Sequence, residues 1–418
     1  MRRLVIEKSA VKNNLAVIKE RAAGAVIYGV LTGDGQGAGL VELARALRAE
    51  GIGRFAVSEV SEAAALRKAG FVEEELLMLR STTDREELEG LLDLNVVCTI
   101  GSVDAGLALN AVAEGRSTIA EAHIQVDTGM GFGGFLVSEP EKLLSVYRSL
   151  PNVAVSGLCT QLHTLKPDGR DLDSQLADFT RAVEAIHAAG FETGIVHAAG
   201  SYALLHCTQA RLDGVRAGSA LLGRCRRRPG DGLRRVGYGE AGIQETRWLP
   251  KGHTVGGDAP VAMKKPTRVA VLPVGYQNGF GAQRPRESGL FALLRWWMRA
   301  RKQTVQIGGQ KARVIGPIGA IETLVDVTEM KCGPGDAAVF ELDPGVARAV
   351  HAGPYRVLGL HIGVFARLGD KPRHIRRAAE AGYFPRPAHW PYQLVVEGIR
   401  AAQHVLVEVL VAVEADGG

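Results

Sequence analysis

Residues 54–80 read RFAVSEVSEAAALRKAGFVEEELLMLR and contain one complete strand–helix–strand unit. Arg54–Ser58 and Leu76–Arg80 are short, mainly apolar runs, as expected for buried strands. Between them, Glu62–Ala69 has apolar residues at three- and four-residue spacing, which predicts an amphipathic helix, and Gly70 follows as its C-cap. Strands that are joined through a helix run parallel, so this stretch predicts one unit of an α/β fold.

The same unit recurs along residues 25–223. Eight strand candidates alternate with helical segments, and eight parallel strands are the number that closes a (β/α)8 barrel. An open doubly wound sheet is the competing fold, because a glycine-rich stretch, residues 33–39, follows the first strand as a dinucleotide-binding turn would. No acidic residue in the ribose-binding role ends the second strand, which favours the barrel. The strand candidates are Ala25–Leu31, Arg54–Ser58, Leu76–Arg80, Val96–Ile100, Ala122–Val126, Val153–Gln161, Thr193–His197 and Leu212–Arg216.

The pattern changes after the eighth strand. A basic, glycine-rich linker, Arg226–Gly232, is followed by strands separated by turns, which predicts a smaller, mainly antiparallel β domain. We expect a TIM-type barrel over residues 1–230, the β domain over 231–370, and a tail over 371–418 whose apolar stretch Tyr392–Val413 could form a helix. The β-domain strand candidates are Thr267–Val274, Thr304–Ile307, Ala312–Ile315, Thr323–Val327, Ala337–Glu341 and Tyr355–Leu360.

The composition is that of an ordinary globular protein, with 46% hydrophobic and 23% charged residues among 418. No run approaches the roughly 20 apolar residues of a membrane-spanning helix, and the N-terminus meets a charge too early for a signal peptide, so we expect a cytoplasmic protein. The net charge of +5 gives no reason to expect nucleic-acid binding. Five scattered cysteines predict neither a disulfide framework nor a metal site. A basic segment with two tryptophans, Leu290–Arg301, could lie on a membrane surface or pack against protein.

Several motifs, in order along the chain, resemble those of the alanine racemase family. His123–Gly131, HIQVDTGMG, is similar to the family's K-x-D-T-G-M-G-R, and His197–Ser201, HAAGS, to its H-x-A-N-S. Tyr28–Gly37, YGVLTGDGQG, looks like the strand and loop that hold a lysine followed by D-x-Y-G, and Arg216–Ser219 stands where the family has R-x-G. The resemblance covers roughly residues 1–365. It extends through Trp248–Gly252, Pro273–Phe280 and Val325–Val327.

The resemblance implies a pyridoxal-phosphate enzyme, but the residues that carry that chemistry differ here. Enzymes of this family hold the cofactor as an imine on the first-strand lysine, which is also one catalytic base, and only a primary amine can form that bond. We therefore expect no covalently bound cofactor and a remodelled site. The departures are Thr32 for this lysine, Gln36 for the loop tyrosine, Phe132 for an arginine, Gly257 for the tyrosine that a partner subunit supplies as second base, and Ala320-Ile321 for a substrate-binding M-D pair.

Other positions keep the residue that the family has. The resemblance implies that they bind an anionic ligand or phosphate group and line the pocket, at the ends of barrel strands where such sites form. Arg216 matches the arginine that contacts the pyridine nitrogen, and His163 and His197 match histidines of the pocket. The phosphate-binding matches are Ser201, Gly218, Ser219 and, more loosely, Tyr355.

Three functions remain open. The first is a cofactor-independent enzyme acting on a small amino-acid-like or anionic substrate, for which Cys159, His163, His197 and Asp127 are the catalytic candidates. Cys159 and His163 lie four residues apart, an even spacing that places two strand residues on one face. The second is a catalytically inactive homologue with a binding or regulatory role. The third is an alanine racemase that binds pyridoxal phosphate non-covalently. The resemblance also implies a head-to-tail homodimer.

Overall fold

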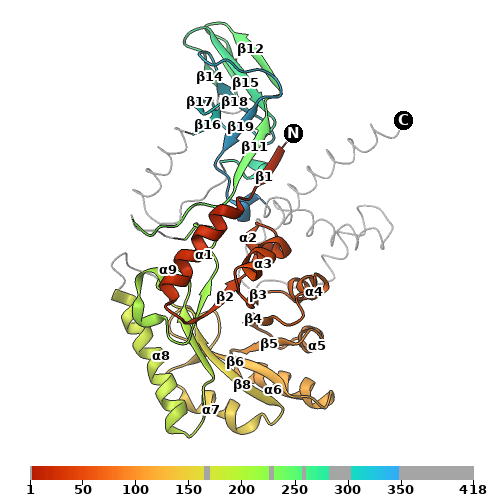
Figure 1. Ribbon diagram of the computed structural model, residues 1–418, viewed down its shortest axis with the longest axis vertical. Helices are drawn as coiled ribbons and strands as arrows, with labels where there is room; N and C mark the ends of the chain where they lie inside the picture. The colour runs from red at the N-terminus through yellow and green to blue at the C-terminus, as the bar shows by residue number, and fades with distance from the viewer. Residues whose placement is uncertain (1, 164–169, 226–229, 257–259, 282–302, 348–418) are drawn as a thin grey trace, which may run out of the picture. The chain divides into compact units, whose positions relative to one another are not determined.

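The computed structural model describes residues 2–163, 170–225, 230–256, 260–281 and 303–347. The predicted strand Tyr355–Leu360, the tail 371–418 and the segment Leu290–Arg301 lie outside these residues. Two large sheets, one parallel and one antiparallel, and a separate two-stranded hairpin are found in the part that is described (Figure 1).

Eight parallel strands close into a barrel, as the repeated unit predicts. Each strand pairs with neighbours in parallel register, and β5 pairs with both β4 and β6, which closes the circle. A ninth short strand, β7 (Phe135–Leu136), pairs with β6. The barrel strands are β2 (Val26–Val30), β3 (Arg54–Val57), β4 (Glu75–Ser81), β5 (Val96–Ile100), β6 (Ala120–Asp127), β8 (Val153–Thr160), β9 (Ile195–Ala199) and β10 (Gly214–Ala217).

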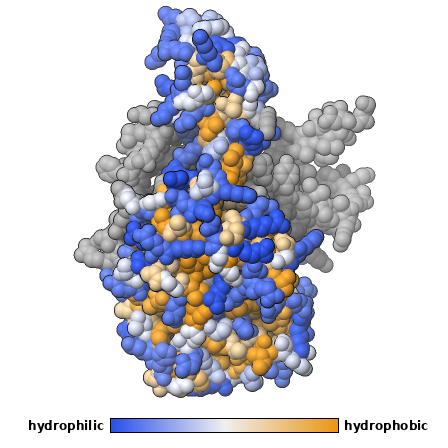
Figure 2. Space-filling model, viewed as in Figure 1, coloured by the Kyte–Doolittle hydropathy of each residue, from blue (hydrophilic) through white to orange (hydrophobic). Residues whose placement is uncertain are grey.

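Helices connect the barrel strands, and their apolar sides pack on the sheet. Helix α3 shows the pattern, since Leu40, Leu43, Ala44 and Leu47 are buried at three- and four-residue spacing. Hydrophobic and hydrophilic residues are interspersed on the outer face drawn in Figure 2. No described helix is long and apolar enough to cross a membrane. The helices are α1 (Lys8–Ala22), α2 (Thr32–Gln36), α3 (Leu40–Ala49), α4 (Val60–Lys68), α5 (Arg85–Asp93), α6 (Val103–Gly115), α7 (Pro140–Ser149), α8 (Arg170–Ala188) and α9 (Ser201–His206).

The second sheet is antiparallel throughout, with eight strands in the order β1-β11-β19-β16-β17-β18-β15-β12. Its first strand, β1, comes from the N-terminus and pairs with β11, a long-range contact that the sequence pattern did not predict. A small hairpin of β13 (Thr254–Val255) and β14 (Val261–Ala262) lies apart from this sheet. The sheet strands are β1 (Arg2–Val5), β11 (Tyr238–Gly242), β12 (Glu245–Leu249), β15 (Thr267–Leu272), β16 (Thr304–Ile307), β17 (Gln310–Ile315), β18 (Thr323–Asp326) and β19 (Ala337–Phe340).

Candidate ligand-binding site

Arg216, on β10, is the central charge of the candidate site and is only 6% exposed. Its guanidinium donates hydrogen bonds to the main-chain oxygens of Thr160 (2.5 Å) and His197 (3.0 Å) and to Oε1 of Gln161 (3.0 Å). Burial lowers the pKa of Arg216 from its ordinary value, but a guanidinium keeps its proton in proteins. A fixed positive charge therefore lies beside the carboxyl ends of β8, β9 and β10, the edge where barrels build their sites.

The ring of His197, on β9, lies next to this guanidinium and is fully buried. Nη1 of Arg216 is 2.6 Å from Nδ1 of His197, and Nε2 of His197 is 2.9 Å from Nδ1 of His123 on β6. The ring of Tyr28, on β2, stacks on His197 with 5.4 Å between centroids. The strands β2, β6 and β9 are not neighbours in the barrel, so these rings meet across its interior.

A carboxylate anchors the other end of this group. The hydroxyl of Tyr28 donates to Oε1 of Glu75 (2.7 Å), and Nε of Arg54 donates to Oε2 of the same carboxylate (2.7 Å). Sequence reasoning assigned no role to Tyr28, His123 or Glu75. The sequence signal that points to such residues is a polar side chain within a short apolar strand, because a polar group that is buried there needs a hydrogen-bond partner.

Three of the predicted phosphate-binding residues, Ser201, Gly218 and Ser219, lie together at the ends of β9 and β10 and are called the cradle below. Oγ of Ser201, the first residue of α9, accepts hydrogen bonds from the main-chain N–H groups of Gly218 and Ala220, both at 3.1 Å. Ser219 lies between these two residues and is half-buried. Main-chain N–H groups and a hydroxyl are the kinds of group that bind anions in proteins, and here both N–H groups donate to the Ser201 hydroxyl.

Gln36 reaches this cradle from the loop after β2. Gly33, Asp34 and Gly35 have left-handed backbone angles, and Gln36 itself has a φ of 54°. This turn brings the Gln36 carboxamide over Gly218, where a Cβ would stand 2.3 Å from Nε2 of Gln36. The same Nε2 donates a long hydrogen bond of 3.4 Å to the main-chain oxygen of Val30. A neutral amide donor therefore borders the anion cradle.

The contacts of the four catalytic candidates place them in two groups, Asp127 and His163 at the loop of Gly129, and Cys159 and His197 on adjacent strands. Asp127 accepts hydrogen bonds from the main-chain N–H groups of Gly129 and Gly131, which shapes its own loop. The ring of His163 lies against Gly129, where a Cβ would be 2.9 Å from Nε2. Cys159 lies level with His197 on the adjacent strand, and burial raises the pKa of its thiol although Arg216 opposes the shift. His197 is enclosed, with both ring nitrogens next to other side chains.

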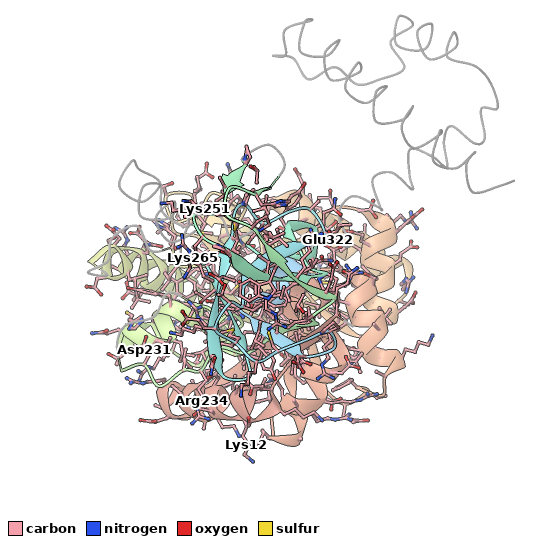
Figure 3. The ribbon with its side chains drawn as sticks, turned by 90° about the horizontal axis from the view of Figure 1, so that it is seen from above. Lys12, Asp231, Arg234, Lys251, Lys265 and Glu322 are labelled. Atoms are coloured by element: carbon pink, nitrogen blue, oxygen red, sulfur yellow. The ribbon has the colours of Figure 1, made fainter. Side chains whose placement is uncertain are left out.

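Thr32 begins α2 directly beyond the carboxyl end of β2, at the position that the resemblance matches to the lysine. Every lysine among the described residues is exposed, including Lys12, Lys251 and Lys265, which Figure 3 labels. Within that part of the chain, no lysine stands at the barrel interior to replace the missing amine.

The other positions matched to the resemblance lie on exposed loops or outside the described residues. Phe132 is 82% exposed on the loop after β6, and Ile321 is 55% exposed in the β domain, beside Ala320. Gly257 and Tyr355 fall outside the residues that the structure describes, so their roles stay predictions.

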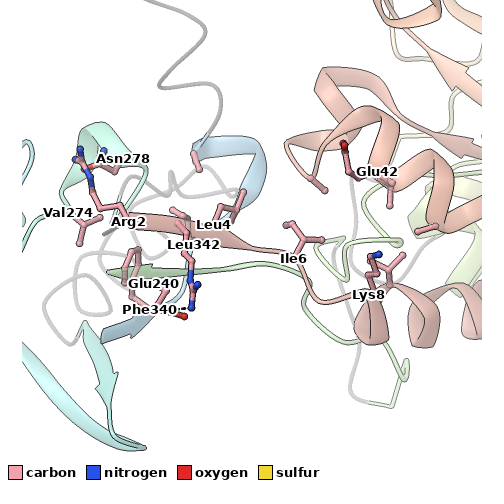
Figure 4. Close-up of a pocket in the computed structure, with 16 residues that line it drawn as sticks. Arg2, Leu4, Ile6, Lys8, Glu42, Glu240, Val274, Asn278, Phe340 and Leu342 are labelled. Atoms are coloured by element: carbon pink, nitrogen blue, oxygen red, sulfur yellow. Dashed lines mark hydrogen bonds and ion pairs between the residues drawn. The ribbon is translucent and has the colours of Figure 1, made fainter. Parts of the chain in front are cut away.

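A cavity of about 640 Å³ lies elsewhere, between the N-terminal strand, α3 and the antiparallel sheet (Figure 4). Its walls include apolar side chains such as Leu4 and Phe340 and charged ones such as Arg2 and Glu42. None of the predicted site residues lines it. We place the candidate site at the barrel ends instead, because Arg216 lies on β10 and Gly218 of the cradle follows directly after that strand.

Comparisons with known proteins agree with this architecture. The family model described as the alanine racemase N-terminal domain matches residues 6–225, and that of the alanine racemase C-terminal domain matches residues 238–350. The solved alanine racemase of Bartonella henselae has 20% identity and a TM-score of 0.69, over 84% of this chain and 97% of that one, a likeness of fold alone.

Curated relatives are similar over most of the chain. An alanine racemase of Desulfovibrio desulfuricans is 30% identical over 335 residues, 78% of this chain and 84% of the relative. A broad specificity amino-acid racemase of Vibrio vulnificus is 30% identical over 342 residues, 80% of this chain and 78% of the relative. The chain belongs to the alanine racemase family.

Proposed function

We propose that this member of the alanine racemase family binds a small anionic, amino-acid-like ligand at the carboxyl ends of its barrel strands and does not hold pyridoxal phosphate as an imine. The observation that carries the proposal is Thr32 at the matched lysine position, together with the exposure of every described lysine. A hydroxyl cannot form an imine with the cofactor. The residues that the resemblance matches to anion binding, by contrast, are present, namely Arg216 and the Ser201 cradle.

The burial, hydrogen bonds and pKa values of the catalytic candidates favour a binding or regulatory role over cofactor-independent catalysis. A general base has to reach the proton that it removes. His197 is fully buried, and the carboxylate of Asp127 already accepts main-chain hydrogen bonds. A raised pKa leaves the Cys159 thiol protonated at neutral pH, whereas the thiolate is the reactive form. Of the four candidates, half-buried His163 remains the one best placed to touch a ligand.

The residues present fit the non-covalent part of pyridoxal phosphate but not its covalent attachment. Arg216 would face a pyridine nitrogen or a ligand carboxylate, and Ser201, Gly218 and Ser219 would receive the phosphate. The Bartonella henselae alanine racemase was solved with covalently bound pyridoxal phosphate, whereas this chain has Thr32 where the resemblance places the lysine. The chain therefore lacks, at this position, the amine that covalent attachment of the cofactor requires.

Racemisation with non-covalently bound pyridoxal phosphate is the second candidate function. Relatives named alanine racemase at 30% identity over more than three quarters of the chain favour it. Racemisation requires a proton donor and a proton acceptor. The lysine that would serve as one of them is missing, and Gly257 stands at the position that the resemblance matches to the partner-subunit tyrosine, the other one. A homodimer is part of both proposals, because the family resemblance places a β-domain loop of one subunit at the other's barrel.

Titration calorimetry separates these functions. We expect inorganic phosphate, or D- or L-alanine, to bind the purified protein with a measurable heat, and racemisation of alanine with added pyridoxal phosphate to stay at background. Turnover of alanine that depends on added pyridoxal phosphate would establish the second function instead. Absence of binding by phosphate, alanine and pyridoxal phosphate alike would reject both.

A further inference from the structure

Two neutral histidines are enclosed side by side in the barrel interior. His123 is 1% exposed and His197 is 0% exposed, and their rings are 5.0 Å apart between centroids. The ring of His123 occupies the space that a Cβ on Gly157 would take, at 2.5–2.7 Å. Tyr28 meets His123 edge-on and stacks on His197. Packing therefore holds both rings in place.

The direction of each hydrogen bond in this group follows from the guanidinium. Arg216 has donors only, so its Nη1, 2.6 Å from Nδ1 of His197, must donate to an unprotonated nitrogen. The proton of a neutral His197 is then on Nε2, which faces Nδ1 of His123 at 2.9 Å. His123 has to accept with Nδ1 and carry its own proton on Nε2. The donor Arg216 at one end and the acceptor Nδ1 of His123 at the other thus favour the same tautomer of His197.

The surroundings keep both rings neutral. Burial lowers the pKa of His123 to about 4 and holds that of His197 well below 6.5, and the positive charge of Arg216 acts in the same direction on both. A proton on Nδ1 of His123 would confront the Nε2–H of His197 with a second donor. The chain of donation from Arg216 therefore requires a neutral His123.

We infer that His123 is a positioning residue, which fixes His197 as an acceptor for Arg216 and so holds the guanidinium at the ligand-binding end of the barrel. The inference rests on the proposed function only in so far as it assigns ligand binding to Arg216 at the barrel ends. Hydrogen-bonded partners of this kind orient a side chain that itself contacts the ligand, as second partners of metal-binding histidines do. His123 does not touch the ligand; it acts through His197.

Long-range proton–nitrogen NMR spectra of histidine-labelled full-length protein test this without any ligand. For wild type we expect unprotonated Nδ1 and protonated Nε2 on both rings between pH 6 and 8, with each ring assigned in the wild-type protein through its connection to the backbone signals of its own residue. A protonated Nδ1 on His197 would overturn the inference by itself. This measurement needs only the wild-type protein, so it can contradict the inference even if a variant fails to fold.

Two variants then test the positioning role. His123→Leu keeps the bulk and removes the acceptor, so we expect the His197 ring signals to change and exchange of the Arg216 Nη protons with water to accelerate at least about tenfold. His123→Asn offers an acceptor near the place of Nδ1 and should restore slow exchange. His187→Leu, at an exposed position of α8, is the matched control.

Unchanged His197 signals and unchanged exchange in His123→Leu would show that His123 only fills space. Equal effects of the Leu and Asn variants would contradict the role of the acceptor. Neither measurement involves a ligand. If the protein bound neither phosphate nor alanine, the proposed function would fail, but the spectra would still determine the tautomers of both rings.

Discussion

Nε2 of Gln36 lies 2.3 Å from the point where a Cβ on Gly218 would stand. The two residues belong to the loop after β2 and to the end of β10, which are neighbouring strands of the closed barrel. Gly218 is thus the residue that lets the Gln36 side chain approach the anion cradle. The same principle, a glycine that makes room for a functional side chain, applies deeper in the barrel.

Gly157→Ala should destabilise the protein by about 1–3 kcal/mol, the usual cost of overpacking a core. The new Cβ would meet the rigid, buried ring of His123 at 2.5 Å. Chemical denaturation of the two proteins measures the difference. Gly53→Ala is the control, because Gly53 is exposed and a Cβ there has no atom within 4 Å. Equal free energies of unfolding for Gly157→Ala and wild type would show that the His123 ring is free to move.

The free energy of unfolding should fall as the pH is lowered from about 6.5 to about 4. His123 has a pKa of about 4 when folded against an ordinary value of 6.5, so the unfolded chain binds more protons in this window. Its contribution to the loss approaches roughly 3 kcal/mol. Burial is the main cause, Arg216 and Arg54 lower the pKa further, Glu75 raises it, and His197 shifts in the same direction as His123.

Denaturation at several pH values with wild type and His123→Asn tests this dependence. The variant should show a shallower loss between pH 6.5 and 4.5. Carboxylates contribute below that window: Arg80 lowers the pKa of Glu87 to about 2, so its stabilisation is lost only as the pH falls from about 4.5 towards 2. The same slope in both proteins would contradict a neutral, buried His123.

Arg216→Ala should weaken the binding of phosphate or alanine by about 1.5–3 kcal/mol, the scale of a charge-assisted hydrogen bond. Calorimetry on wild type and variant measures the difference, and circular dichroism checks that the variant is folded. Arg181→Ala removes an exposed arginine of α8 and should leave affinity unchanged. Equal losses in both variants would indicate an effect of net charge rather than a site at Arg216.

The protein should sediment as a homodimer at micromolar concentration. Tyr276 and Ile321 are exposed by 51% and 55% on adjoining β-domain loops, which are joined by the hydrogen bond from the Tyr276 N–H to the main-chain oxygen of Gly319. Ile321→Arg should therefore shift the equilibrium towards monomer, because a charge would replace an apolar contact. Val72→Arg, at a barrel residue that is 66% exposed, is the control. A stable wild-type monomer would contradict the expectation.

Elements with strong local signals were predictable from sequence. Val96–Ile100 and Thr304–Ile307 were predicted with the bounds that β5 and β16 have, because each is an apolar or β-branched run flanked by turns. β1 was missed, since its strand character comes from pairing Arg2 with Ala241, far along the chain. No local pattern encodes such a partner.

The site was predictable in part, for the same reason. Motif resemblance located Arg216, His197 and Ser201, and these lie at adjoining strand ends. The contact of His123 with His197 joins strands that are not neighbours, and the approach of Gln36 to the cradle depends on a left-handed turn. Spacing alone gives neither. The even spacing of Cys159 and His163 carries no information about a shared face, because β8 ends at Thr160 and His163 lies beyond it.

Borohydride reduction in the presence of pyridoxal phosphate, followed by peptide mass spectrometry, tests the central claim most directly. Thr32→Lys is the positive control, in which an adduct at position 32 is expected, with racemase turnover still low because Gly257 supplies no second base, a loss on the order of 10²–10⁴ in rate. For wild type we predict no site-specific reduced adduct on any lysine. A stoichiometric adduct on one wild-type lysine would contradict the account.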